Sequence, residues 1–130
     1  SNITQAGYLD VSGTTNGSSI FVVSPSRVFL GVGNTLLILD TTNPSNITTL
    51  GTYNANGTIN DLYVAGSLVF LATSNSNSEL QIVNISNIAS PVLWSSLNFP
   101  QVATGIDYQN NLIYVSVRSN DGLRIVTSAQ

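Results

Sequence analysis

Six carboxylates carry most of the acid–base capacity of this sequence, which contains no His and no Cys. A glycosidase uses two carboxyl groups as its acid and base, so a pair of them could support that chemistry. No two of the six are close in sequence, and Asp side chains commonly bond their own backbone in turns. We therefore interpret them as caps of turns and strand ends and predict no catalytic residue and no enzyme: Asp10, Asp40, Asp61, Glu79, Asp107 and Asp121.

Two polar segments offer the oxygen ligands that Ca²⁺ prefers, Ser119–Gly122 and Ser74–Ser78. Neither has the regular Asp spacing of a calcium-binding loop, and Asn-Asp-Gly is common in hairpin turns. Serine cannot form a conventional catalytic triad without His. Gly31-Val-Gly33 has no following helix to hold a phosphate. We therefore predict no metal and no cofactor.

Aromatic side chains beside carboxylates are the remaining candidates for ligand binding, because a flat ring can stack on a sugar. The residues that could form such a rim are Asp61, Asp107, Trp94 and Tyr108. Trp94 matches Leu50 of the repeat described below, and this match favours a place in the core. Phe29, Phe70 and Tyr114 occupy equivalent repeat positions, so we expect all three in the core.

Charge is scarce in this chain of 130 residues: 7% of residues are charged and the net charge is −3. The basic residues are Arg27, Arg118 and Arg124. Three guanidinium groups cannot neutralise a phosphate backbone or an anionic membrane surface, so we expect neither partner. No apolar run approaches the ~20 residues that span a bilayer. The chain starts with Ser1 and carries no signal peptide, and we expect a processed chain or an excised segment.

Five Asn-X-Ser/Thr sequons occur, which in a secreted protein would be acceptors of N-linked glycans. Chance alone could produce many of them in a chain rich in Asn, Ser and Thr. Together with the absence of Lys, they favour an extracellular or cell-surface location. The candidate glycosylation sites are Asn2, Asn16, Asn46, Asn56 and Asn84.

An internal repeat runs through the chain. One segment recurs as Arg27–Gly31, Leu68–Ala72 and Leu112–Ser116. It is followed each time by a second one with Ile at its centre, at Ile38, Ile82 and Ile125. A period near 44 residues is typical of propeller blades. Alternating apolar residues between Gly-, Asn- and Ser-rich turns indicate about four short strands per unit.

The repeat predicts an all-β fold of the β-propeller type, with three four-stranded blades in a single domain over 1–130. The blade repeats cover about 12–53, 57–97 and 102–127. The last of them stops after its third strand, whereas an additional strand, 4–11, precedes the first. Propellers often close by such a shift, so we expect 4–11 to complete the last blade, in cis or in trans within an oligomer.

The repeats resemble the LVIVD repeat family of propeller-like surface proteins. Leu36–Pro44, Leu80–Asn87 and Gly122–Val126 are similar to the family stretch Gly-Leu-x-Ile-Val-Asp-Ile-Ser-Asn-Pro, and Asp61–Val64 is similar to its preceding strand. The sequence departs from the pattern where Asn84 and Thr127 stand in place of Asp, and we align Ile20 and Gly105 with Asp61. The resemblance implies propeller architecture and extracellular display, and no single activity.

Three blades cannot easily close, because four is the usual minimum for a propeller. An open stack would expose an apolar face at each end, which soluble monomers rarely tolerate. The remaining blades of a longer chain could cover these faces. A second copy could do so in a six-bladed dimer, or strand donation could form a filament.

We therefore predict a non-enzymatic structural or adhesion module that acts through protein–protein assembly. One alternative is a glycan- or ligand-binding propeller with its site at the axial mouth. Another is a subunit of a surface filament assembled by strand donation. Two carboxylates within ~5–10 Å in a cleft would instead favour a hydrolase.

Overall fold

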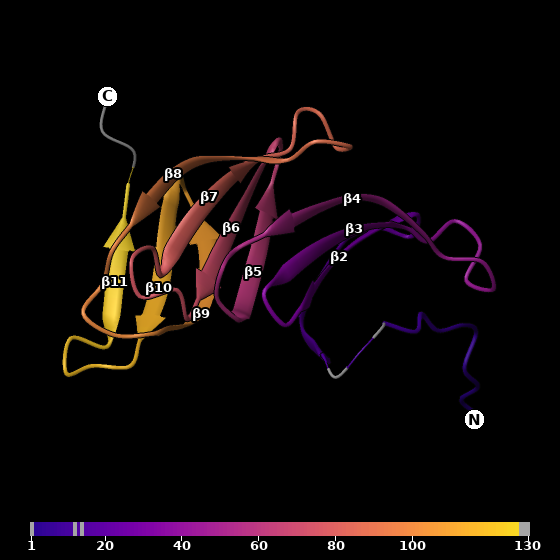
Figure 1. The fold of residues 1–130 in the computed structure, drawn as a ribbon, viewed down its shortest axis with the longest axis horizontal. Coiled ribbons are helices and arrows are strands. Elements are labelled where there is room, and N and C mark those ends of the chain that lie inside the picture. Colours follow the sequence, from indigo (N-terminus) through magenta and orange to yellow (C-terminus); the bar gives the residue numbers. More distant parts are fainter. Residues whose placement is uncertain (1, 12, 14, 128–130) are drawn as a thin grey trace.

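The computed structural model describes residues 2–11, 13 and 15–127, and these residues form strands, turns and loops without any helix (Figure 1). The strands assemble into three antiparallel sheets in chain order. The first sheet contains β1 (Gly17–Ser24), β2 (Arg27–Val32), β3 (Thr35–Asp40) and β4 (Thr48–Asn54). The second contains β5 (Ile59–Ala65), β6 (Leu68–Thr73), β7 (Leu80–Asn84) and β8 (Val92–Leu97). The third contains β9 (Ala103–Gln109), β10 (Leu112–Val117) and β11 (Leu123–Val126).

The three sheets share one register, which confirms the repeat in the structure. Phe29 pairs with Ile38 in the first sheet, Phe70 with Ile82 in the second and Tyr114 with Ile125 in the third. Two-residue turns join β1 to β2, β2 to β3, β5 to β6 and β9 to β10. Gly33 and Gly66 occupy two of these turns at φ values of 57° and 59°, a left-handed conformation that residues with a side chain rarely adopt.

The sheets pack face to face like an open fan (Figure 1). Their first strands lie together, β1 against β5 and β5 against β9, while the outer strands diverge. One apolar core lies between the first and second sheets and contains Phe29, Ile38 and Leu71. Another lies between the second and third sheets and contains Phe70, Leu80 and Val115. The described sheets do not close on themselves, because the first and third sheets lie at opposite ends of the fan.

Repeated hydrogen bonds join each sheet to the next beside the inner strands. Ser18 Oγ donates to the carbonyl oxygen of Ile59 at 2.6 Å. Asn60 Nδ2 donates to the carbonyl oxygen of Ala103 at 2.8 Å. These two bonds are equivalent in the repeat. Ser18 stands two residues before Ile20, which pairs with Leu30 of β2. Asn60 stands two residues before Leu62, which pairs with Leu71 of β6. Successive sheets are therefore stacked in the same way.

The loops that follow β3 and β7 also have the same hydrogen bonds. Oδ1 of Asp40 accepts from the backbone N–H of Thr42, as Oδ1 of Asn84 does from that of Ser86. The backbone N–H of Asn46 donates to the carbonyl of Asn43, as that of Ser90 donates to Asn87. Pro44 in the first loop therefore corresponds to Ile88 in the second.

The structure contradicts completion of the third sheet by residues 4–11 of the same chain. Those residues form no strand, and they lie at the opposite end of the molecule from β11, beside the loop of Pro44 (Figure 1). The physical reason is the open fan: the third sheet lies two sheets away from the one that the N-terminal segment contacts. Among the described residues, the third sheet therefore has three strands, and the outer edge of β11 has no partner strand.

Candidate functional site

The outward face of the first sheet, which we call the head face, carries exposed apolar side chains. Ile20 and Val22 of β1 are 62% and 60% exposed, and Leu30 beside them is partly exposed. Ile20 pairs with Leu30 as Leu62 pairs with Leu71 in the second sheet. Leu62 and Leu71 are 2% and 0% exposed, in the core against the first sheet. The head face therefore repeats a surface that the fold buries elsewhere.

The outward face of the third sheet, the tail face, shows the same relationship. Leu123 and Ile125 of β11 are 62% and 56% exposed, with Tyr114 of β10 beside them. Their counterparts in the second sheet are Leu80, Ile82 and Phe70, which pack against the third sheet. The tail face thus has the residue types with which each sheet contacts the sheet that follows it.

Head and tail faces are complementary for this reason. Inside the chain, an aromatic–Leu–Ile face always packs on the aliphatic face of the next sheet, as Phe29, Leu36 and Ile38 do on the second sheet. The same pairing outside the chain would place the tail face of one molecule on the head face of another. Such a contact is heterologous, with different surfaces contributed by the two partners.

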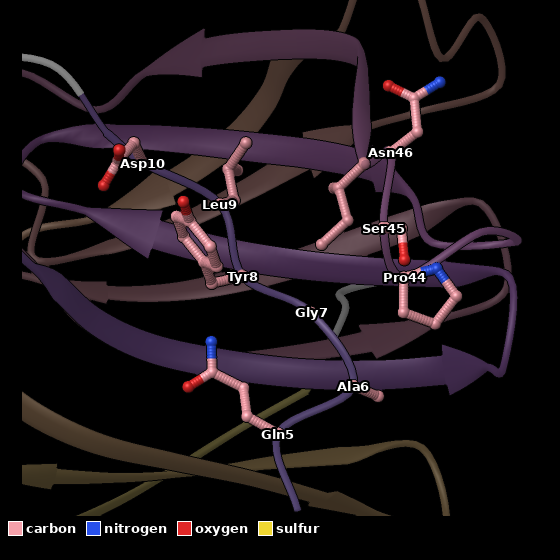
Figure 2. Close-up of a pocket in the computed structure, with 10 residues that line it drawn as sticks. Gln5, Ala6, Gly7, Tyr8, Leu9, Asp10, Pro44, Ser45 and Asn46 are labelled. Carbon is pink, nitrogen blue, oxygen red and sulfur yellow. The ribbon is translucent and has the colours of Figure 1, made fainter.

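The N-terminal segment lies beside the loop that joins β3 and β4 of the first sheet. A Cβ atom added to Gly7 would overlap the carbonyl oxygen of Pro44, and one added to Gly51 of β4 would overlap that of Ile88. Gly7 and Leu9 are half-buried, whereas Tyr8 between them is exposed, which is the alternation of an extended strand. Figure 2 shows this segment running past the loop of Pro44, Ser45 and Asn46. Residues 5–10 thus contact the first sheet as β4 contacts the second.

The two carboxylates of the expected ligand rim accept hydrogen bonds from backbone N–H groups. Asp61 accepts the N–H of Leu62 at Oδ1 and that of Ile106 in the next sheet at Oδ2, both at 2.9 Å. Asp107 accepts the N–H of Tyr108 at 2.8 Å. The pairing register also corrects one alignment: Ser19, not Ile20, is the counterpart of Asp61, opposite Gly31 as Asp61 is opposite Ala72.

The two aromatic residues of the rim line one groove between the second and third sheets. Trp94 and Leu97 of β8 form one side, and Tyr108 and Val126 form the other, around about 910 Å³. Trp94 is 59% exposed, so the prediction that it packs in the core is wrong. Tyr108 stacks on Phe70 with ring centroids 5.1 Å apart. The structure brings Trp94 and Tyr108 together and leaves Asp61 and Asp107 outside this groove.

The other carboxylates have separate surroundings. Glu79 is buried and accepts the N–H of Phe99 at 2.7 Å, and Asp121 lies 3.5 Å from Arg124 at the surface. Hydrogen bonds from the hydroxyl and the N–H of Thr42 lower the pKa of Asp40. Within the described part of the chain, no three acidic residues gather as a metal site would require.

The core prediction for the three equivalent aromatics holds at two positions. Phe29 and Phe70 are 1% and 4% exposed, whereas Tyr114 lies partly exposed on the tail face, where no further sheet covers it. The Asn side chains of four sequons are exposed, and Asn84 is half-buried because it caps the loop after β7. No helix in the described residues is long and apolar enough to cross a membrane.

A shared register and equivalent contacts between sheets define a tandem β-sheet repeat protein. The LVIVD repeat model matches residues 23–55 and 56–98, more than half of the sequence, and the chain belongs to the LVIVD repeat family. No curated protein matches this sequence. A solved structure described as that of the computationally designed Ika4 protein has a similar fold, at a TM-score of 0.53 and 9% identity. The alignment covers 98% of this chain and 100% of Ika4.

Proposed function

We propose that the chain is a non-enzymatic, propeller-type assembly module that acts through contacts between its head and tail faces. The observation that supports this proposal is the repeat equivalence of those faces. Ile20 and Leu123 are each 62% exposed, while their counterparts Leu62 and Leu80 are almost fully buried. Adjacent exposed apolar side chains on one sheet face are typical of an interaction surface.

The apolar contact would be substantial. Full burial of a Leu, Ile or Val side chain contributes about 1.5–3 kcal/mol, part of which offsets the entropy lost on association. Polar side chains at the contact between two copies would be arranged like those between successive sheets of one chain. Thr104 is the counterpart of Asn60, so its hydroxyl would face the N-terminal end of β1 in a second copy, as Asn60 faces Ala103.

Two single-face variants test this proposal. Ile20→Asp places a charge on the head face, and Leu123→Asp places one on the tail face. Each variant alone has lost one half of every head-to-tail contact and should be monomeric in analytical ultracentrifugation. An equimolar mixture should form a heterodimer, because the intact head of the Leu123→Asp chain can bind the intact tail of the Ile20→Asp chain.

The control is Ser76→Asp, an exposed position in the loop between β6 and β7 of the second sheet, which belongs to neither face. This variant should assemble like the original chain. A mixture that remains monomeric would refute complementary faces, provided that both variants give the same far-ultraviolet circular dichroism spectrum as the original chain.

Carbohydrate binding in the groove of Trp94 and Tyr108 is a second candidate function. An exposed indole and a phenol at one groove provide apolar faces for a sugar ring, and Asn111 and Ser96 supply polar groups beside them. Trp94→Ala should then abolish retention on a glycan array while assembly persists. If the original chain binds no glycan on the array, this candidate function is wrong.

The extracellular or cell-surface location remains part of this proposal. Exposed Asn2, Asn16, Asn46 and Asn56 are accessible acceptors, and scarce charge and absent Lys suit a surface module. Expression in a secretory eukaryotic host followed by glycosidase digestion would show whether these sites accept glycans. A head-to-tail contact that fails to close would produce the filament form of the same module.

A further inference from the structure

We infer that residues 4–9 form the fourth strand of the third sheet in a second copy of the chain, so that two chains close a ring of six sheets. This inference rests on the proposed head-to-tail contact and adds to it a donated strand with a defined register. The donated strand pairs with β11, whose outer edge has no partner strand among the described residues.

The N-terminal segment lies over the loop after β3 as β4 lies over the loop after β7. β4 belongs to the first sheet but passes over the loop after β7 of the second sheet, where Gly51 meets Ile88. The N-terminal segment passes over the equivalent loop after β3, where Gly7 meets Pro44. It is therefore placed where the fourth strand of a sheet stacked on the head face would lie. The proposed occupant of that place is the third sheet of another molecule.

The backbone of the N-terminal segment is also available for pairing. Within the described residues, none of residues 2–11 takes part in a backbone hydrogen bond, although the segment is extended. A strand without a partner leaves its N–H and C=O groups to water, and an open sheet edge is a template for a strand from another chain. Pairing with β11 of a second copy would satisfy both edges at once.

The strand pairing within the two complete sheets gives the register of the donated strand. Gly51 pairs with Ile38 and Ser95 with Ile82 in the two complete sheets. Gly7 corresponds to these two residues, so it should pair with Ile125 of the second copy. Tyr53 pairs with Leu36, and this places Leu9 opposite Leu123. Thr52 pairs with Leu37, and this places Tyr8 opposite Arg124.

Closure follows from the number of sheets. Two chains supply six, which lies within the usual range of about four to eight propeller blades. A head-to-tail contact made twice around a two-fold axis leaves no exposed head or tail face. Each chain then donates its N-terminal segment and accepts that of its partner, so the third sheet of each chain gains a fourth strand.

Disulfide trapping tests the register directly, because the chain contains no Cys. Leu9→Cys and Leu123→Cys are introduced together and oxidised at low protein concentration. Directly opposite residues on antiparallel strands have Cβ atoms about 4.5–5.5 Å apart, close enough for a disulfide after a small shift. We expect a covalent dimer on a non-reducing gel that disappears on reduction. Tyr8→Cys with Arg124→Cys, the next pair in the same register, should give the same result if the first variant folds poorly.

The matched control pairs Leu9→Cys with Ser90→Cys, an exposed position in the loop between β7 and β8 of the second sheet. This pair should give no covalent dimer above the level of each single-Cys variant. A disulfide formed within one chain would overturn donation to a second copy, and a ladder of higher species would overturn the closed ring. Strand donation is wrong if neither of the two test pairs, Leu9 with Leu123 and Tyr8 with Arg124, crosslinks as Cys variants. The proposed face contact still stands in that case if the mixture of the two single-face Asp variants forms a heterodimer. If that mixture also fails, the proposed function is wrong as well.

Discussion

Gly51 lies against the backbone carbonyl of Ile88 so closely that no side chain fits between them, and Gly7 is related to Pro44 in the same way. The first pair joins the first sheet to the second. The second pair joins an N-terminal segment without strand partners to the first sheet. The contact of Gly51 with Ile88 therefore shows how the N-terminal segment is positioned, although that segment belongs to none of the three sheets.

Gly51→Ala should destabilise the chain, because the added methyl group would overlap a backbone atom that cannot move without shifting the loop after β7. Overpacking of this kind typically costs about 1–3 kcal/mol. The measurement is the free energy of unfolding from urea titration. Gly122→Ala is the control, since a Cβ at Gly122 would meet its nearest neighbour at 3.6 Å, in ordinary contact. Equal stability of the two variants would contradict the close approach.

Ile38→Ala and Ile125→Ala compare one repeat position in a buried and in an exposed sheet. Ile38 is 0% exposed, so its truncation should cost about 2–5 kcal/mol. Ile125 is 56% exposed and its truncation should change the stability of the isolated chain little. Unfolding is measured for both at a concentration low enough to dissociate any assembly. A large loss of monomer stability in Ile125→Ala would show that the chain itself covers the tail face.

Asp61→Ala should loosen the contact between the second and third sheets. The change removes the acceptor of two backbone N–H groups and leaves that of Ile106 without its partner. An unsatisfied buried donor costs about 1–3 kcal/mol. Amide hydrogen exchange should therefore accelerate in β9. The matched variant is Asp107→Ala, which removes a single exposed bond and should leave exchange in β9 unchanged except at Tyr108. Similar exchange in both variants would contradict a joining role for Asp61.

Alkaline unfolding should depend on Tyr53. Burial raises the pKa of this phenol above its ordinary value of 10.0, and its hydroxyl donates to Gln81 at 2.8 Å. A folded-state pKa above the unfolded one gives stability that is complete below about pH 10 and decreases as the pH rises through the folded-state pKa. Tyr53→Phe should reduce stability at neutral pH by about 0.5–1.5 kcal/mol and flatten its decrease above pH 10. The measurement is the melting temperature from pH 8 to 12, and an unchanged slope in Tyr53→Phe would contradict this assignment.

The strands and their register follow closely from sequence, because apolar alternation and turn residues are local signals. The repeat segment Leu68–Ala72 lies within β6, and the equivalence of Phe29 with Phe70 is confirmed by their pairing with Ile38 and Ile82. The position of residues 4–11 in the structure did not follow from the sequence. The sequence predicted that this segment completes the third sheet, whereas in the structure it forms no strand and lies beside the loop of Pro44 in the first sheet.

The prediction that Trp94 packs in the core failed for a related reason. Its counterpart Leu50 packs against the core of the first two sheets beside Ile88. In the structure, the indole of Trp94 instead borders the groove between the second and third sheets. Periodicity predicts which side of a strand faces a neighbour, whereas the presence of that neighbour depends on tertiary and quaternary structure.

The central claim is that a second copy covers the head and tail faces, and the molar mass in solution tests it most directly. Light scattering coupled to size-exclusion chromatography should give twice the 13.7 kDa of the single chain at micromolar concentration. The dimer should withstand 1 M salt, because its contacts are apolar. A mass of 13.7 kDa at every concentration up to the solubility limit would contradict the claim.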